Sequence, residues 1–146
     1  MGDTLKRGVL FAGPYGTGKT MLASYIARIA TQCGWTFIYV KDSEELPSAL
    51  SYAVQYQPVV VFAEDIDRVA GLERTDEVNE LLNQLDGIDG KTAQIMTLVT
   101  TNHMERINAA MCRPGRIGVP IEIPPPDAEA VSRMIRQFAG KTLDSK

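Results

Sequence analysis

The chain has 146 residues, 45% of them hydrophobic and 23% charged, which suits a single domain with a real core. Its formal net charge of −3 argues against a nucleic-acid reader held by phosphate contacts, because such proteins are usually basic overall. The sequence contains no apolar run that approaches a membrane span and no signal pattern at its start. Cys33 and Cys112 lack metal-ligand spacing, so we expect free, reduced thiols in a cytoplasmic protein.

The first elements predicted along the chain are a buried strand over residues 8–12, a glycine-rich loop, and a helix over residues 21–30. The loop fits the phosphate-binding pattern G-x-x-x-x-G-K-[ST] and has the required setting between a strand and a helix. We therefore predict that nucleotide binds to Gly13, Pro14, Tyr15, Gly16, Thr17, Gly18, Lys19, Thr20 and Met21.

The chemistry of this loop suits a triphosphate. Gly16 and Gly18 carry no side chain that would keep phosphate oxygens away from the backbone N–H groups. Lys19 can reach the β and γ phosphates, and the Thr20 hydroxyl can ligate Mg²⁺. The following helix adds the positive end of its dipole.

Strands and helices continue to alternate after this unit. Further strands are predicted over residues 36–40, 59–63, 95–100 and 119–123. Helices are predicted over residues 44–56 with Ser43 as the cap, over 73–86 with Gly87 after the last turn, and over 127–138. This alternation predicts an α/β fold in which helices cover both faces of a parallel sheet.

Polar side chains follow two of the predicted strands. Glu64 and Asp65 come after residues 59–63, and Asn102 comes after residues 95–100. Ligands bind at the carboxyl ends of strands in such sheets, so one carboxylate can hold Mg²⁺ through water and the other can orient an attacking water. Asn102 can contact the γ-phosphate or that water. The alternative is that the acidic residues are solvated strand ends.

The loop containing Arg113 and Arg116 precedes the last strand. Nothing in its pattern marks the two arginines as ligands of the chain's own phosphate. They are either surface charge or groups donated to a neighbouring subunit, where an arginine stabilises transition-state charge. Periodicity alone does not choose between these.

Five segments in order make the chain resemble the AAA family of ring-forming ATPases. Residues 6–20 resemble the family's first strand with the Walker A loop, and residues 81–87 resemble its L-L-x-x-L/M-D-G helix. Residues 100–102 resemble its sensor 1, residues 108–117 its R-P-G-R loop, and residues 121–127 the link to its lid. The resemblance covers the large α/β subdomain almost end to end.

This resemblance implies a P-loop NTPase three-layer sandwich with a five-stranded parallel sheet in the order 5-1-4-3-2. It implies ATP/ADP and Mg²⁺ as cofactors, with Thr20 and Glu64 at the metal. Asp65 would be the catalytic base and Asn102 sensor 1, with Arg113 and Arg116 acting in trans. Residues 1–138 would form the large subdomain, and 139–146 a frayed tail where the lid is cut off. The implied partners are further copies in a ring, by family resemblance a hexamer, and a protein substrate.

Two of the departures from the family bear directly on the nucleotide site. The acidic pair, usually D-E, is Glu64-Asp65 here, and the shorter Asp65 carboxylate implies slow turnover. Alternatively Asp65 takes the metal role after a small shift of the strand, although Pro58 and the Ile66-Asp67 pair favour the first register. The lid is absent, so we expect weak nucleotide affinity and poor ring formation from this segment alone.

The sequence therefore predicts an ATPase module that drives remodelling of proteins or protein complexes. One alternative is a module that holds ATP as a structural switch with negligible hydrolysis. The other is an AAA ATPase that handles nucleic acid, against which the acidic composition argues.

Overall fold

The computed structural model describes residues 7–73, 75–87, 93–118 and 120–143. Within these ranges five parallel strands form one sheet in the order β2-β3-β4-β1-β5. The strands are β1 (Arg7–Ala12), β2 (Thr36–Val40), β3 (Val59–Ala63), β4 (Ile95–Thr101) and β5 (Ile121–Glu122). The predicted strand order is confirmed, and this is the P-loop NTPase α/β fold.

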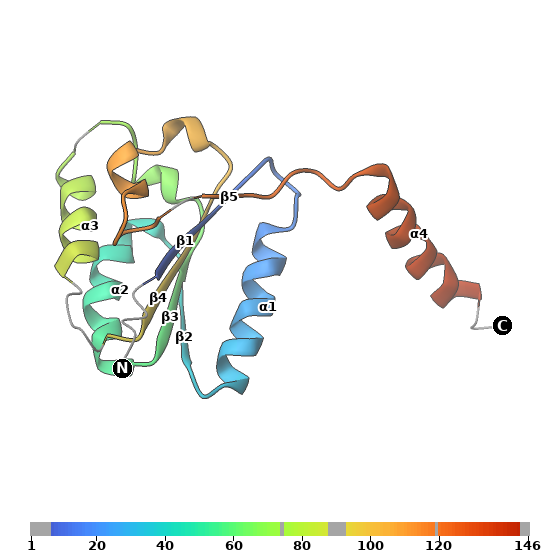
Figure 1. Ribbon diagram of the computed structural model, residues 1–146, viewed down its shortest axis with the longest axis horizontal. Helices are drawn as coiled ribbons and strands as arrows, with labels where there is room; N and C mark the ends of the chain where they lie inside the picture. The colour runs from blue at the N-terminus through green and yellow to red at the C-terminus, as the bar shows by residue number, and fades with distance from the viewer. Residues whose placement is uncertain (1–6, 74, 88–92, 119, 144–146) are drawn as a thin grey trace.

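Helices cover both faces of the sheet in three layers (Figure 1). Helix α1 (Lys19–Gln32) lies on one face, and α2 (Leu46–Ala53) and α3 (Asp76–Gly87) lie together on the other. Helix α4 (Ala128–Leu143) projects away from the body after β5. No helix in the described ranges has both the length and the apolar character needed to cross a bilayer.

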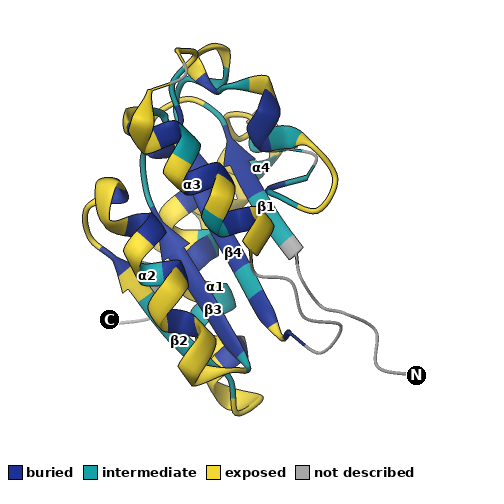
Figure 2. Ribbon diagram, turned by 90° about the vertical axis from the view of Figure 1, so that its left-hand side faces the viewer, coloured by how far each residue is buried: buried dark blue, intermediate teal, exposed yellow. Residues whose placement is uncertain are grey.

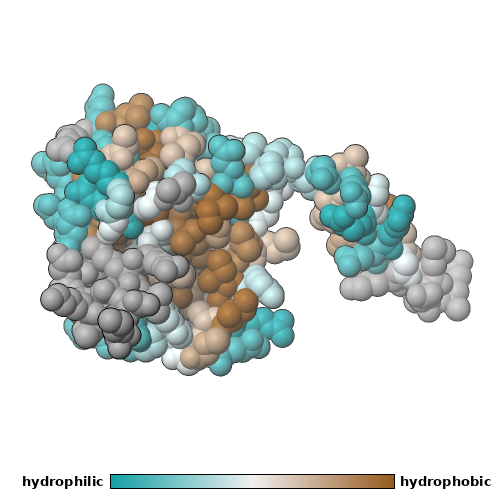
Figure 3. Space-filling model, in the orientation of Figure 1, coloured by the Kyte–Doolittle hydropathy of each residue, from teal (hydrophilic) through white to brown (hydrophobic). Residues whose placement is uncertain are grey.

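The central strands are buried on both sides. All five residues of β3, Val-Val-Val-Phe-Ala, are buried, which explains why that strand shows no polar alternation. Leu81 and Leu85 of α3 pack with Leu50 of α2 on one face of the sheet, and Figure 2 shows the buried strands behind these two helices. Phe62 and Ala23 belong to a second cluster on the α1 face, and Figure 3 shows hydrophobic residues gathered on this part of the body.

The predicted helix over residues 44–56 is wrong in its details. A 3₁₀ turn (Ser43–Glu45) precedes α2, and another (Val54–Tyr56) follows it. The cap of the first turn is Asp42, whose carboxylate accepts the Glu44 N–H at 3.2 Å. Ser43 is buried and instead donates its hydroxyl to the Asp65 carbonyl at 3.3 Å.

Other element boundaries also differ from the prediction. Strand β5 pairs over two residues only, because Pro120 and Pro124 flank it and neither has an N–H to donate. Val119, where this strand was predicted to begin, lies outside the described residues. Helix α3 begins at Asp76 and includes Gly87, and α4 extends to Leu143, beyond its predicted end at residue 138.

Candidate functional site

The phosphate loop lies at the carboxyl end of β1 and leads directly into α1. Gly16 and Gly18 have φ values of 76° and 95°, a region that glycine adopts without strain. Gly18 is the N-cap of α1, and the first turn of that helix contains no acidic residue. The N–H groups of the loop and the positive helix end are therefore left for an anion.

Glycine is required at position 13 because there is no room for a side chain, not because of a positive φ. A Cβ at this position would lie 2.2 Å from the carbonyl oxygen of Ile123, at the end of β5. The Gly13 N–H donates to Thr101 at 3.2 Å, and the Ile123 N–H donates to Ala12 at 2.7 Å. Gly13 thus lets the loop start between the ends of β4 and β5, a close approach that the loop pattern did not reveal.

Lys19 points back into the loop. Its side chain is buried, and Nζ donates to the carbonyl oxygens of Gly13 and Pro14, both at 2.7 Å. Desolvation lowers the pKa of Lys19, while the charge of Asp65 opposes that shift. The cation is therefore placed at the centre of the loop by local backbone groups.

Glu64 follows β3 and meets two hydroxyl groups. Its Oε1 accepts a hydrogen bond from Thr20, on the first turn of α1. Its Oε2 accepts one from the Tyr39 hydroxyl at 3.1 Å, and this bond raises the pKa of Tyr39. The structure thus brings together Thr20 and Glu64, the two residues predicted at the metal, and adds Tyr39, which sequence reasoning missed.

Asp65 contacts residues at the end of β4, away from the partners of Glu64. Its backbone is left-handed, with φ 49° and ψ 51°, a conformation in which aspartate is enriched. Oδ1 accepts a hydrogen bond from the Asn102 side-chain amide at 2.9 Å. The backbone N–H also contacts the Thr100 hydroxyl at 3.4 Å. Consecutive carboxylates therefore have separate partners, Glu64 at the loop and Asp65 at the end of β4.

One cavity of about 410 Å³ unites these groups. Its lining includes Lys19, Thr20, Met21, Glu64, Asp65 and Asn102, together with Tyr15, Gly16 and Gly18. Cationic and N–H groups lie on the loop side and carboxylates on the β3 side. This arrangement suits an anionic ligand that carries a metal ion between the two.

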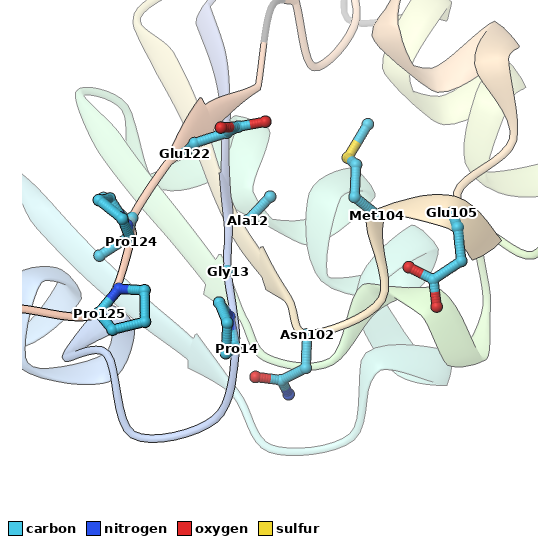
Figure 4. A pocket seen from close by; sticks show the side chains of 10 residues that line it. Ala12, Gly13, Pro14, Asn102, Met104, Glu105, Glu122, Pro124 and Pro125 are labelled. Atoms are coloured by element: carbon cyan, nitrogen blue, oxygen red, sulfur yellow. The ribbon is translucent and has the colours of Figure 1, made fainter.

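A second cavity, of about 350 Å³, lies on the β5 side of the loop (Figure 4). Its lining includes Pro14, Asn102, Met104, Glu105, Glu122 and Pro125. In Figure 4 the Glu122 side chain extends toward Met104 from the β5 side. The residues that line this cavity include two carboxylates and no lysine or arginine, whereas Lys19 lines the first cavity, so the phosphates fit the first cavity better.

Tyr15 and Met21 form the exposed rim of the first cavity. Tyr15 is 75% exposed, and its ring meets His103 edge-on with centroids 6.0 Å apart. Thr17 donates its hydroxyl to the Pro14 carbonyl at 3.0 Å, which closes the loop on itself. The exposed Tyr15 and Met21 side chains give the rim an aromatic and apolar character.

The two arginines lie outside the cavity and differ from each other. Arg113 is exposed, whereas the Arg116 side chain is only 16% exposed. Arg116 donates to both carboxylate oxygens of Asp86, at 2.8 and 2.6 Å, and to the Ala110 carbonyl at 2.9 Å. The hydrogen bonds to Asp86 raise the pKa of Arg116 above its usual value. The structure therefore does not bring either arginine to the chain's own phosphate loop.

Comparison with known proteins agrees with this geometry. Residues 9–125 match the model of the family described as "ATPase family associated with various cellular activities (AAA)". The chain belongs to this AAA family and is an AAA ATPase module. It is 36% identical over 159 residues to the 26S proteasome regulatory subunit 8 homolog of Schizosaccharomyces pombe, covering 93% of the chain. The chain spans 38% of the length of that relative.

Proposed function

We propose that this chain binds and hydrolyses ATP as the module of a ring-forming AAA ATPase that remodels proteins or protein complexes. The observation that supports this proposal most strongly is the cavity shared by the phosphate loop, the Thr20–Glu64 contact and the Asp65–Asn102 pair. Family membership supports the ATPase class in general.

Binding of ATP begins with charge neutralisation. Lys19 would exchange its bonds to the Gly13 and Pro14 carbonyls for bonds to phosphate oxygens, while Gly16 and Gly18 let the backbone N–H groups approach. Tyr15, Thr17 and Met21 would border the bound nucleotide, either ATP or the product ADP.

The oxygen donors present fit magnesium. Thr20 and Glu64 supply a hydroxyl and a carboxylate, and the described residues contain no group of three or more His, Cys, Asp or Glu side chains that could form a cage. Mg²⁺ suits such a site, because it keeps several waters and binds through one or two protein oxygens plus phosphates. When bound there, it would neutralise phosphate charge.

Hydrolysis requires a positioned water. Asp65 would accept a hydrogen bond from that water and polarise it, and Asn102 would hold the Asp65 carboxylate and the water in place. Phosphoryl transfer depends mainly on positioning and electrostatics, so this geometry accounts for most of what the chain must supply.

Arg113 and Arg116 would act on the nucleotide of the next subunit in a ring, which we expect to be a hexamer, and Arg116 would first have to release Asp86. Residues 1–138 would form the large subdomain, and the tail predicted over residues 139–146 would mark the junction with a lid, although residues 139–143 belong to helix α4. The relative named as a proteasome regulatory subunit motivates a protein substrate, and the free Cys33 and Cys112 motivate a cytoplasmic location.

A single-turnover assay on the intact protein tests this proposal, comparing the wild type with Asp65→Asn. We expect the mutant to bind ATP normally and to hydrolyse it about 100-fold more slowly. Glu80→Gln, an exposed change on α3, is the matched control and should leave the rate unchanged. An unchanged rate in Asp65→Asn would remove Asp65 from the catalytic role.

A structural switch is the second candidate. The short Asp65 side chain, turned toward Asn102 by its left-handed backbone, is the observation in its favour. Tight ATP binding by the intact wild-type protein, without measurable turnover, would establish the switch in place of the ATPase.

A further inference from the structure

The pairing of β2 with β3 brings Tyr39 close to Glu64. In the parallel pairing of β2 and β3, Tyr39 lies opposite Phe62. Glu64 follows Phe62 by two residues and lies one residue beyond the end of β3. The Tyr39 hydroxyl reaches Glu64 Oε2 at 3.1 Å.

The Tyr39 ring has a fixed support. It stacks on Phe62 with centroids 5.6 Å apart and an interplanar angle of 25°. Phe62 is itself buried, whereas Tyr39 is 53% exposed. A ring used only to cover the sheet edge would not need its hydroxyl at a carboxylate, and a hydrogen bond to an ionised acceptor is stronger than a neutral one.

Glu64 is the residue that gains from this support. A glutamate side chain has three rotatable bonds, and holding its carboxylate in one orientation costs conformational entropy. Thr20 restrains one carboxylate oxygen, and Tyr39 restrains the other. With both bonds made, the plane of the carboxylate is set before any ligand arrives.

We propose that Tyr39 is a positioning residue that holds Oε2 of Glu64, so that Oε1 faces Thr20 and the magnesium of the nucleotide complex. This inference rests on the proposed function. Tyr39 acts through Glu64 and has no direct role in hydrolysis. Groups that orient the ligands of a metal typically change its affinity 10- to 100-fold when they are removed.

The test uses the intact protein with a non-hydrolysable ATP analogue, adenylyl-imidodiphosphate, and Mn²⁺ as the metal probe. Electron paramagnetic resonance of bound Mn²⁺ reports metal affinity independently of turnover. Tyr39→Phe keeps the ring and removes only the hydroxyl, so we expect the analogue to bind equally well without metal and Mn²⁺ to bind about tenfold more weakly. Tyr25→Phe, an exposed change on α1, is the matched control and should have no effect.

A second comparison separates positioning from edge packing. Glu64→Asp shortens the side chain by one methylene and draws the carboxylate away from Tyr39. In that background Tyr39→Phe should change Mn²⁺ affinity by less than about twofold. A tenfold effect that persists in the Glu64→Asp background would contradict the proposal, because Tyr39 would then act by another route.

Two negative results are distinguishable. Normal binding of the analogue with unchanged Mn²⁺ affinity in Tyr39→Phe would overturn the role of Tyr39 and leave the proposed function standing. Failure of the wild type to bind the analogue, with or without metal, would overturn the proposed function and this inference with it.

Discussion

Asp86 and Arg116 are joined by two hydrogen bonds, of 2.8 and 2.6 Å, between one carboxylate and one guanidinium. The pair connects the end of α3 to the loop before β5, and the Ala110 carbonyl accepts a third bond from the same arginine. Bidentate geometry makes this one of the stronger surface ion pairs. Arg116 therefore has a structural role within its own chain, whereas Arg113 is exposed.

The two arginines should therefore respond differently to truncation. Arg116→Ala should lower the free energy of unfolding by about 1 kcal/mol, since Asp86 is half exposed and the pair is partly screened. Arg113→Ala should stay within about 0.5 kcal/mol of the wild type. Urea unfolding followed by circular dichroism measures both. Equal destabilisation by the two changes would contradict the cis role assigned to Arg116.

Asn102 is predicted to affect hydrolysis and not nucleotide affinity. Its amide holds Asp65, so Asn102→Ala should slow single-turnover hydrolysis in the intact protein about 100-fold. The dissociation constant for ATP should change by less than about threefold. Asn83→Ala, on the exposed side of α3, serves as the control. A mutant that loses binding and turnover in equal measure would show that Asn102 contacts the nucleotide mainly in its ground state.

The close approach of Gly13 to Ile123 can be tested by adding a methyl group at position 13. The Cβ of Gly13→Ala would meet the Ile123 carbonyl at 2.2 Å, and relief of that clash requires β5 to move. We expect a loss of about 1–3 kcal/mol in the free energy of unfolding. Gly87→Ala is the control, because a Cβ at Gly87 has no neighbour within 4 Å and alanine favours the helix. Destabilisation of similar size by both changes would argue against the close approach.

Much of this fold could be predicted from the sequence, since the signals are local. Strands buried on both faces appear as continuous apolar runs, so the bounds predicted for β2 and β3 are those observed. The apolar period of α3 identified its buried face, including Val78 and Leu82. β5 was predicted too long, because its two flanking prolines remove the donors that would extend it.

The site was predictable only in part. The loop pattern predicted residues 13–20 and the strand ends predicted Glu64, Asp65 and Asn102, and the structure places several of these residues around one cavity. Contacts between distant segments leave no local pattern, so the hydrogen bond of Tyr39 to Glu64 was missed. The same holds for Ser43, which was predicted as a cap and instead contacts the Asp65 backbone across the sheet end.

The two cysteines should differ in reactivity. Burial raises the pKa of the Cys112 thiol, so at a given pH less of it is thiolate, and Cys33 is exposed. Iodoacetamide at pH 8 should modify Cys33 at least about fivefold faster in the folded protein, as read by mass spectrometry. The difference should disappear in urea. Faster modification of Cys112 in the folded state would contradict the burial assigned to it.

Calorimetric titration of the intact protein with ATP, in the presence of Mg²⁺, tests the nucleotide site most directly. The wild type should bind saturably at or below about 1 mM, and Lys19→Met should bind about 10- to 100-fold more weakly, since it loses charged bonds to phosphate. Lys41→Met, an exposed control at the end of β2, should bind like the wild type. Absence of binding by the wild type, or equal affinity in Lys19→Met, would contradict the assignment of residues 13–20 as the phosphate cradle.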